Sequence, residues 1–413
     1  MALTDVLFVD LGTEQLLVDG DVVVARGSLG LAPAGARVLE CRGARVVPGS
    51  VNAHTHLYSG LAGLGMPAPT RPPENFVQIL ERVWWRLDRA LDRESLTRSA
   101  ELYVAEALLH GTTALVDHHE SPEFIRGSLD TLADAADALG CRLATGYGAT
   151  DRNAGEAEGR AGLDECRRFA ETNRRARVKP LVALHASFTV GDATVRYAGK
   201  LARELSLPVH VHVAEDRADV SDAQTRGHPG PLERLLSLGA LPPGSILAHG
   251  VHLERSQVEE ATGRGLWLVQ NPRSNAGNRV GFAHALGNDA RVALGTDGYP
   301  ADMRAEREAL ASEAARAGAT LSDEVPASRI RASRALASEL FGLRLSDAVE
   351  AGSTADLAIF DDGAAPRPRH VIVGGELVVH DFALARGDMA QIEARAREIA
   401  PRLWEKMTSY PEP

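Results

Sequence analysis

Apolar and polar positions follow a repeating pattern through most of the chain. From about residue 48 to 345, short apolar runs alternate with long stretches of helical spacing, such as 94–110 and 192–205. Short apolar runs bounded by polar residues are typical of buried strands, and strands that alternate with helices form a parallel sheet. Eight such runs occur, and they end near residues 54, 117, 146, 185, 212, 249, 270 and 297. Eight repeats predict an α/β fold, a closed (β/α)8 TIM barrel with its active site where the strands end.

The two ends of the chain have a different pattern of apolar and polar residues. Short apolar runs punctuated by Gly and Asp occupy 6–25 and 45–47, and 356–379 continues in the same way with a hairpin signal at Gly374-Gly375. Chain ends often lie close together, so we expect residues 1–47 plus 350–413 to form a small β-sandwich domain. Residues 48–349 then form the barrel. A doubly wound open sheet is the alternative, but it does not explain polar residues at the ends of all eight strands.

The first barrel strand ends in two alternating histidines, His54 and His56. Residues i and i+2 of a strand project to the same face, so the two imidazoles point the same way. Two imidazoles on one face at a strand end are the beginning of a metal site. The pair alone is also compatible with two turn histidines, so the prediction depends on ligands from other strands.

Other strand ends supply those ligands. His212 ends the fifth strand, with Glu215 three residues later, which favours His212 as a ligand and His210 as its support. Asp297 ends the eighth strand, although an aspartate there could instead cap the next helix. Three histidines and one aspartate suit one divalent metal, Zn²⁺ or Fe²⁺, with a coordination position left for water.

Hydrolysis at a metal of this kind also needs a side chain that transfers protons. The metal lowers the pKa of bound water from about 15.7 towards about 7 and polarises the bond under attack. Glu215 is the best-placed carboxylate to act as general acid and base, and His249 at the end of strand six is a second polar group that could hold the attacking water. Surface and structural roles for these two residues are the alternatives.

The distribution of lysine indicates one metal rather than two. A carbamylated lysine that bridges two metals, as in the dihydroorotase and hydantoinase types, would stand at the end of strand four. His185 occupies that place, and Lys179 lies at the opposite end of the strand. The chain has only two other lysines, both within predicted helices.

Composition narrows the function classes. The formal net charge of −11 argues against non-specific binding of nucleic acid, which needs a basic surface. The three cysteines form no CxxC pair, so the P-C-x-x-C signature of one class of zinc deaminases cannot be built. Scattered cysteines indicate a reducing compartment, and neither a signal peptide nor a membrane-spanning apolar stretch is visible. We therefore expect a cytoplasmic protein that does not enter a membrane.

Taken together, these motifs resemble the amidohydrolase superfamily in its deaminase branch, which includes cytosine and guanine deaminases and chlorohydrolases. The pattern PG-x-x-(N/D)-x-H-x-H corresponds to 48–56, H-x-x-E to 212–215, (V/A)HG to 248–250 and GTD to 295–297. The chain is also similar, over nearly its whole length, to the SsnA-like aminohydrolases. Segments that carry this second resemblance are 84–92, 117–122, 150–153, 188–190, 214–216 and 273–275.

The resemblance implies roles for particular residues. It implies a metal held by His54, His56, His212 and Asp297. It further implies that Asp297 takes a proton from water, that Glu215 protonates a ring nitrogen and that His249 orients the water. His185 and His119 would contact the substrate. Ser187, where relatives usually have proline, and the compact segment after Asp297 are departures that leave the substrate open.

The predicted activity is hydrolytic removal of an exocyclic amino group from a small N-heterocycle such as a purine, pterin or pyrimidine, a reaction at a cyclic amidine. The residues leave two alternatives open. The same site could open a cyclic amide or amidine ring or displace another leaving group such as halide. A catalytically silent barrel that binds a heterocycle or a partner is the other alternative. Large barrels of this kind often pair, so a homo-oligomer, a dimer, is expected.

Overall fold

The computed structural model describes residues 6–361 and 366–413 of the chain. Eight parallel strands form the barrel, and each predicted apolar run is found as one of them. An additional short strand, β9 (Val178–Pro180), pairs with β8 beside the barrel path. The eight strands are β6 (Ser50–Thr55), β7 (Thr112–His119), β8 (Arg142–Ala149), β10 (Val182–Ala186), β11 (Val209–Val213), β12 (Ile246–His249), β13 (Trp267–Gln270) and β14 (Val292–Leu294). The predicted TIM barrel is therefore confirmed.

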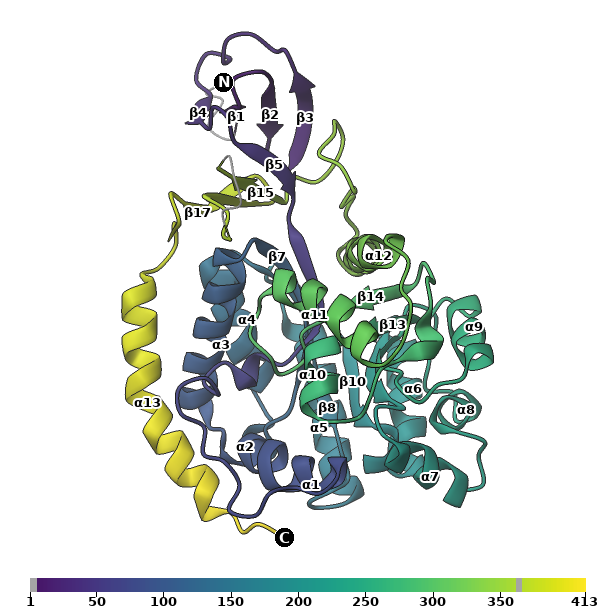
Figure 1. Cartoon of the computed structure of the whole chain (residues 1–413). Helices are drawn as coiled ribbons and strands as arrows, with labels where there is room; N and C mark the ends of the chain where they lie inside the picture. The colour runs from purple at the N-terminus through teal and green to yellow at the C-terminus, as the bar shows by residue number, and fades with distance from the viewer. Residues whose placement is uncertain (1–5, 362–365) are drawn as a thin grey trace.

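Helices surround the barrel, as Figure 1 shows. The two helical stretches expected from spacing are α3 (Arg93–Leu109) and α6 (Asp192–Leu205). A π-helix, η2 (Leu80–Trp84), joins the first two short helices. The remaining α-helices are α1 (Phe76–Ile79), α2 (Trp85–Ala90), α4 (Ser128–Leu139), α5 (Glu156–Thr172), α7 (Arg217–Thr225), α8 (Pro231–Ser237), α9 (Arg255–Gly263), α10 (Pro272–Gly277), α11 (Met303–Arg316), α12 (Glu324–Phe341) and α13 (Met389–Ser409). None of the helices in the described part of the chain is long and apolar enough to cross a bilayer.

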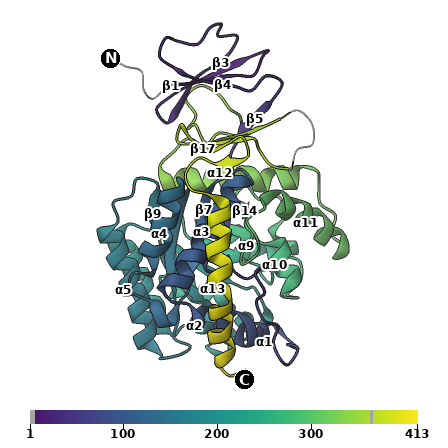
Figure 2. The same cartoon turned by 90° about the vertical axis from the view of Figure 1, so that its left-hand side faces the viewer.

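Two small sheets lie at one end of the barrel (Figures 1 and 2). One has the order β3-β2-β1-β4, and the other has the order β18-β17-β16-β15-β5, so strands from both chain ends build the second sheet. Apolar side chains from both sheets, including Leu16 and Ile372, share one core. This is the expected β-sandwich. Its strands are β1 (Val6–Asp10), β2 (Gln15–Asp19), β3 (Val22–Gly27), β4 (Arg37–Glu40), β5 (Arg45–Pro48), β15 (Leu357–Phe360), β16 (His370–Val373), β17 (Glu376–His380) and β18 (Ala383–Leu384).

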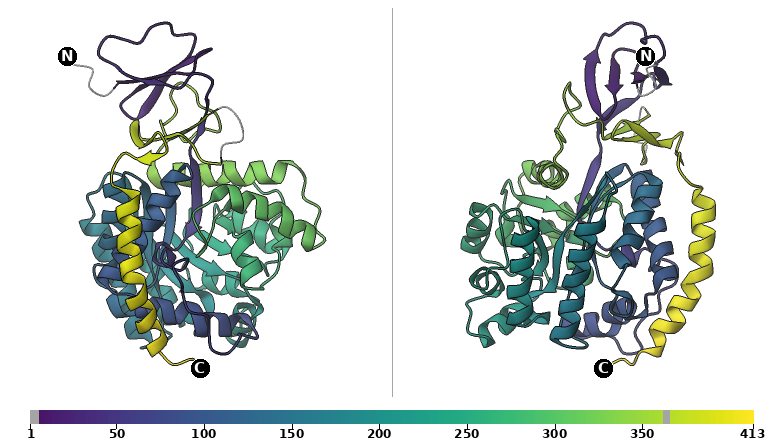
Figure 3. Two further views of the ribbon diagram at one scale, coloured as in Figure 1. Left: turned by 60° about the vertical axis from the view of Figure 1, so that its left-hand side comes forward. Right: turned by 180° about the vertical axis from the view of Figure 1, so that it is seen from behind.

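The last helix lies against the barrel. Figure 3 shows α13 running along the barrel side, where it packs on α2 and α3. The Trp404 indole donates to the carbonyl of Leu64, and the Tyr410 hydroxyl donates to that of Arg89. Residues 389–409, which the sequence assigned to the small domain, thus pack on barrel helices. The amphipathic helix has an apolar stripe that the two thin sheets could not cover.

The barrel closes between β6 and β14. The carbonyl of His54 accepts hydrogen bonds from the backbone N–H groups of Thr296 and Asp297, each at 3.0 Å. Asn52 reinforces this seam, because its amide oxygen accepts from the Thr296 N–H at 3.0 Å and its amide nitrogen donates to the Thr296 hydroxyl at 2.7 Å. The seam fixes two candidate ligands, His54 and Asp297, relative to each other.

A side chain at position 295 would force this seam apart. A Cβ on Gly295 would lie 2.6 Å from the carbonyl oxygen of His54 and 2.7 Å from its nitrogen. We expect Gly295→Ala to lower the free energy of unfolding by about 1–3 kcal/mol, the usual cost of overpacking, and to lower metal content. Urea unfolding and elemental analysis measure the two effects. Gly63→Ala is the control, because a Cβ there meets nothing within 4 Å. Equal stability of the two variants would contradict the prediction.

Candidate metal centre

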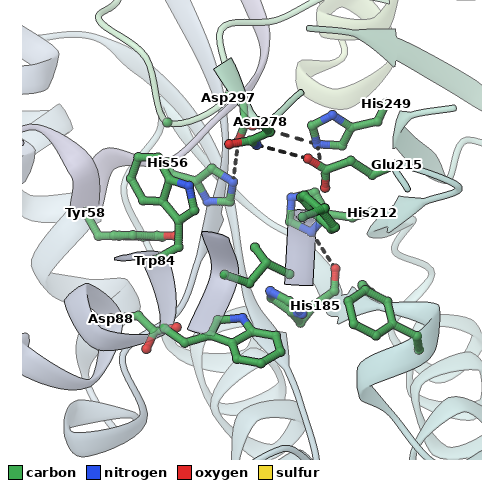
Figure 4. Close-up of a pocket in the computed structure, with 16 residues that line it drawn as sticks. His56, Tyr58, Trp84, Asp88, His185, His212, Glu215, His249, Asn278 and Asp297 are labelled. Carbon is green, nitrogen blue, oxygen red and sulfur yellow. Dashed lines mark hydrogen bonds and ion pairs between the residues drawn. The ribbon is translucent and has the colours of Figure 1, made fainter. Parts of the chain in front are cut away.

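The predicted ligands converge at the carboxyl ends of three strands. His54 lies on β6 with His56 just after it, His212 lies on β11, and Asp297 follows β14. All four side chains are buried. Figure 4 shows His56, His212 and Asp297 facing a common space together with His249 and Glu215. The structure thus brings together residues that are up to 243 positions apart in the sequence, as His54 and Asp297 are.

Donor atoms from four side chains lie within reach of one ion, and His56 belongs to a second, overlapping group with His118 and His212. His56 Nε2 is 2.8 Å and His54 Nε2 is 3.5 Å from Asp297 Oδ1. Single donor atoms of His54, His212, His249 and Asp297 all lie within 4.8 Å of one another. Nε2 of His54 and Nε2 of His249 are buried and have no hydrogen-bond partner in the described part of the chain. Unpaired buried imidazole nitrogens next to a carboxylate fit a divalent cation.

The second nitrogen of each histidine has a defined partner. His56 Nδ1 donates to the carbonyl of His118 and His212 Nδ1 to that of His185, each at 2.5 Å. His54 Nδ1 lies 3.0 Å from Nε2 of His210. Because a carbonyl only accepts, Nε2 of His56 and of His212 is left free for a metal, as is usual when an outer partner orients a ligand. This geometry favours His212 as a ligand and His210 as the partner of His54.

Burial and hydrogen bonding set the charges of the donors. Burial lowers the pKa of His54 to about 3 and that of His212 well below its ordinary value, so both imidazoles are neutral. Burial alone would raise the pKa of Asp297, but the neighbouring imidazoles of His54 and His56 hold it well below the ordinary value. Burial alone would lower the pKa of His56, but hydrogen bonds to Asp297 and Glu120 raise it well above its ordinary value, so this imidazole releases a proton when a metal binds.

Asp297 does not cap the helix that follows it. The N-cap of α11 is Asp302, whose carboxylate accepts from the backbone N–H groups of Arg304 and Ala305. Asp297 has a left-handed backbone with φ of 55°, and the Ser274 hydroxyl donates to its Oδ2. His249, with φ of 75°, is strained in the same way. Such strain concentrates at functional sites, where the surrounding fold holds it in place.

Glu215 lies beside the ligand cluster at the pocket wall. Its Oε2 is 3.5 Å from His249 Nε2, and its Oε1 accepts from the Asn278 amide at 3.2 Å. The other ring nitrogen of His249 is 2.9 Å from Asn275 Oδ1. Burial raises the pKa of Glu215 to about 7, although His249 opposes the rise. A carboxyl group with a pKa near neutrality can both give and take a proton.

A buried aspartate holds the turn that presents Glu215. Ala214 has φ of 51°, and its backbone N–H donates to Asp219 Oδ2 at 2.7 Å. Asp219 was not predicted to matter, because nothing in its local sequence indicates burial. Burial raises the pKa of Asp219 to about 7. The carboxyl group therefore stays protonated in the folded protein over a range where it ionises in the unfolded chain.

This difference predicts a pH-dependent stability. With the folded pKa above the unfolded one, the contribution of Asp219 is full below about pH 4 and is lost as the pH rises towards 7. The loss is about 1.4 kcal/mol per pH unit. Asp219→Asn keeps an amide oxygen for Ala214 and does not titrate. We expect wild type to lose stability relative to this variant between pH 5 and 7, with no further change to pH 8. Urea unfolding measures the difference, and parallel curves would refute the prediction.

The two predicted substrate contacts occupy different places. His185, at the end of β10, lines the pocket. The Thr189 hydroxyl donates to the Ala186 carbonyl, so His185 Nδ1 donates to that hydroxyl and leaves Nε2 as an acceptor. His119 is fully buried, with Nε2 2.8 Å from the Ser121 hydroxyl, and it does not line the pocket. The geometry therefore disfavours a substrate contact by His119.

A pocket lies beside the ligand cluster. Aromatic side chains form much of its wall, among them Trp84 and Trp85. Tyr58, Asp88 and Asn278 also line the pocket, and they were not predicted. The residues next to them in the sequence do not indicate a site. The packing of helices around the strand ends brings these side chains to the pocket.

Comparisons with known proteins agree with this description. The Amidohydrolase family model matches residues 45–378. A 5-methylthioadenosine/S-adenosylhomocysteine deaminase from Halobacterium salinarum is 30% identical, covering 93% of this chain and 94% of the relative. An adenosine deaminase structure from Xanthomonas campestris with bound zinc has a TM-score of 0.81 at 24% identity, covering 96% and 98% of the two chains. The zinc-complexed atrazine chlorohydrolase of Arthrobacter aurescens has a TM-score of 0.78 at 20% identity, covering 96% and 100%. The chain belongs to the amidohydrolase family.

Proposed function

We propose that the protein is a metal-dependent aminohydrolase that removes an exocyclic amino group from a small N-heterocycle. The observation that carries the proposal is the position of Glu215, at the pocket wall and 3.5 Å from His249, beside the ligand cluster. Relatives named as deaminases of adenine nucleosides support the same chemistry. Purines are accordingly the first substrates to test.

The metal in this proposal is held by His54, His56, His212 and Asp297. We propose one ion, Zn²⁺ in preference to Fe²⁺, because three imidazoles and one carboxylate form the donor set. When bound, such an ion supplies water of lowered pKa and polarises the bond under attack. His249 Nε2 is also close enough to ligate, but its distance of 3.8 Å from Asp297 Oδ2 equally suits a hydrogen bond to a water between them.

In this proposal, different residues of the chain carry out the separate proton transfers. Asp297 accepts a proton from the attacking water, and His249 orients that water. Glu215 donates a proton to the ring nitrogen beside the carbon under attack, which lets that carbon become tetrahedral. Asp297 then passes its proton to the amino nitrogen, ammonia leaves, and the hydroxyl group of the intermediate returns a proton to Glu215. Asn278, which donates to Glu215 Oε1 at 3.2 Å, keeps the other carboxylate oxygen directed at the pocket.

An assay of ammonia release together with ultraviolet absorbance tests this proposal. Purified protein is supplied with Zn²⁺ and screened against purines, pterins and pyrimidines. Ammonia release with a retained ring chromophore supports deamination. Loss of the chromophore supports ring opening, and chloride release from a chlorinated triazine supports halide displacement. Absence of any turnover with metal bound supports a silent binding barrel.

We also propose a cytoplasmic location and a homodimer. The three cysteines are free and buried, which accords with a reducing compartment. Sedimentation equilibrium of the purified protein tests the dimer, and a single species of 44.0 kDa would exclude it.

A further inference from the structure

Helix α2 presents two polar groups to the pocket that no protein group satisfies. Trp85 and Asp88 both line the pocket and lie three residues apart, so they share one face of the helix. In residues 6–361 and 366–413, Trp85 Nε1 and Asp88 Oδ1 are buried and have no hydrogen-bond partner. Trp85 Nε1 can only donate, and an ionised carboxylate oxygen can only accept. Helix α2 thus carries an unpaired donor and an unpaired acceptor on one face. In Figure 4, Asp88 lies at the far end of the pocket from Asp297 and His249.

The other oxygen of Asp88 shows that the arrangement is held in place. Asp88 Oδ2 forms an ion pair with Arg152 Nη2, and the two side chains are only 2% and 7% exposed. The Arg152 guanidinium also lies over the Trp85 ring, 4.9 Å from its centroid. Arg152 therefore fixes both residues and balances the charge of Asp88, yet it leaves Oδ1 unpaired. An unsatisfied buried oxygen costs about 1–3 kcal/mol, so stability alone does not explain it.

We infer that Asp88 and Trp85 bind a ring C(=O)–NH unit of the substrate, with the N–H donating to Asp88 Oδ1 and the carbonyl accepting from Trp85 Nε1. The inference rests on the proposed function and narrows its substrate to an amino-heterocycle that also carries an oxo group. The aromatic side chains of the pocket contact the faces of the substrate ring. The metal cluster and Glu215 lie beside the amino-bearing carbon, and Asp88 and Trp85 form hydrogen bonds with the opposite edge of the ring. A ring without the oxo group would leave both buried groups unpaired.

Matched pairs of substrates isolate this recognition. Cytosine and 4-aminopyrimidine differ in a C(=O)–NH unit on the far edge from the amino-bearing carbon, as do 8-oxoadenine and adenine. We expect wild type to favour the oxo member of a pair by at least about 100-fold in kcat/KM, because a site built for hydrogen bonds rejects analogues that lack them. Trp85→Phe removes one N–H and keeps the aromatic ring, and Asp88→Asn removes the charge at constant size. Each variant should lower the preference about tenfold or more.

Asp356→Asn is the matched control. Asp356 forms an equally buried ion pair with Arg142, at 2.8 Å and with side chains 1% and 7% exposed, outside the pocket. This variant should lose stability but keep the substrate preference of wild type. A preference near one in wild type, or an unchanged preference in both Trp85→Phe and Asp88→Asn, would overturn the inference.

Calorimetric binding of the same pairs separates this inference from the proposed function. Tighter binding of the oxo members without ammonia release would refute the proposed function and leave the recognition intact. Ammonia release without discrimination within the pairs would do the reverse. A third arm uses adenosine and 5′-deoxyadenosine, whose sugar hydroxyls also donate. Discrimination lost in Asp88→Asn but kept in Trp85→Phe, with nucleosides as the better substrates, would assign Asp88 to a sugar and overturn the inference.

Discussion

Replacing Glu215 with glutamine is expected to lower kcat by about 10³- to 10⁴-fold while leaving metal content unchanged. Proton transfer by a positioned side chain contributes a factor of this order. Glutamine keeps the size of the side chain and its contact with Asn278, but it cannot deliver a proton to the ring nitrogen. Steady-state ammonia release gives kcat, and elemental analysis gives the metal content of the same preparation.

Glu233→Gln is the control for this experiment. Glu233 lies on α8, is partly buried and accepts from the Gln257 amide at 2.7 Å, but it does not line the pocket. Its variant should keep the kcat of wild type. If Glu215→Gln retains more than a tenth of wild-type turnover, another group moves the proton and the proposed mechanism is wrong.

Loss of a ligand is expected to remove both metal and activity. We expect His212→Ala to carry far less than one metal ion per chain and to show no measurable turnover, because the remaining donors no longer surround the ion. Chelation of wild type should give the same inactive state, and added Zn²⁺ should restore activity only in wild type. Zn²⁺ at 100 times its Kd should raise the free energy of unfolding of wild type by about 2.7 kcal/mol, since the ion binds only the folded chain.

His284→Ala provides the comparison for the ligand variant. His284 is exposed and does not line the pocket, so its loss should leave metal content and turnover unchanged. Wild-type protein that stays fully active after complete removal of metal would exclude a metal mechanism. Full metal content in His212→Ala would instead remove His212 from the ligand set.

The barrel could be predicted because each strand carries its own signal. Short apolar runs that end in polar residues mark all eight strands, and the paired glycines at 374 and 375 mark the hairpin between β16 and β17, where both have positive φ. The ligand candidates were found for the same reason, because parallel strands bring their carboxyl ends to one rim. Closure of the barrel then determines that β6 and β14 are neighbours.

Other features depended on contacts that are distant in the sequence. The amphipathic pattern of α13 does not tell which surface covers its apolar stripe, and the structure places it on α2 and α3. His119 follows a strand end just as His185 does, yet only His185 lines the pocket. A histidine at a strand end can point inward or pack beneath its neighbours, and the packing decides which.

The sequence by itself therefore determined the barrel, the candidate ligands and Glu215, because these follow from periodicity within a strand and from the meeting of strand ends. The tertiary structure decided which groups surround them. It set Asp219 behind the turn at Ala214, and it left Asp88 and Trp85 unpaired in the pocket wall. The burial of a side chain, the charges around it and its lack of a hydrogen-bond partner are set only when distant segments pack together. No local pattern of residues could therefore have predicted them.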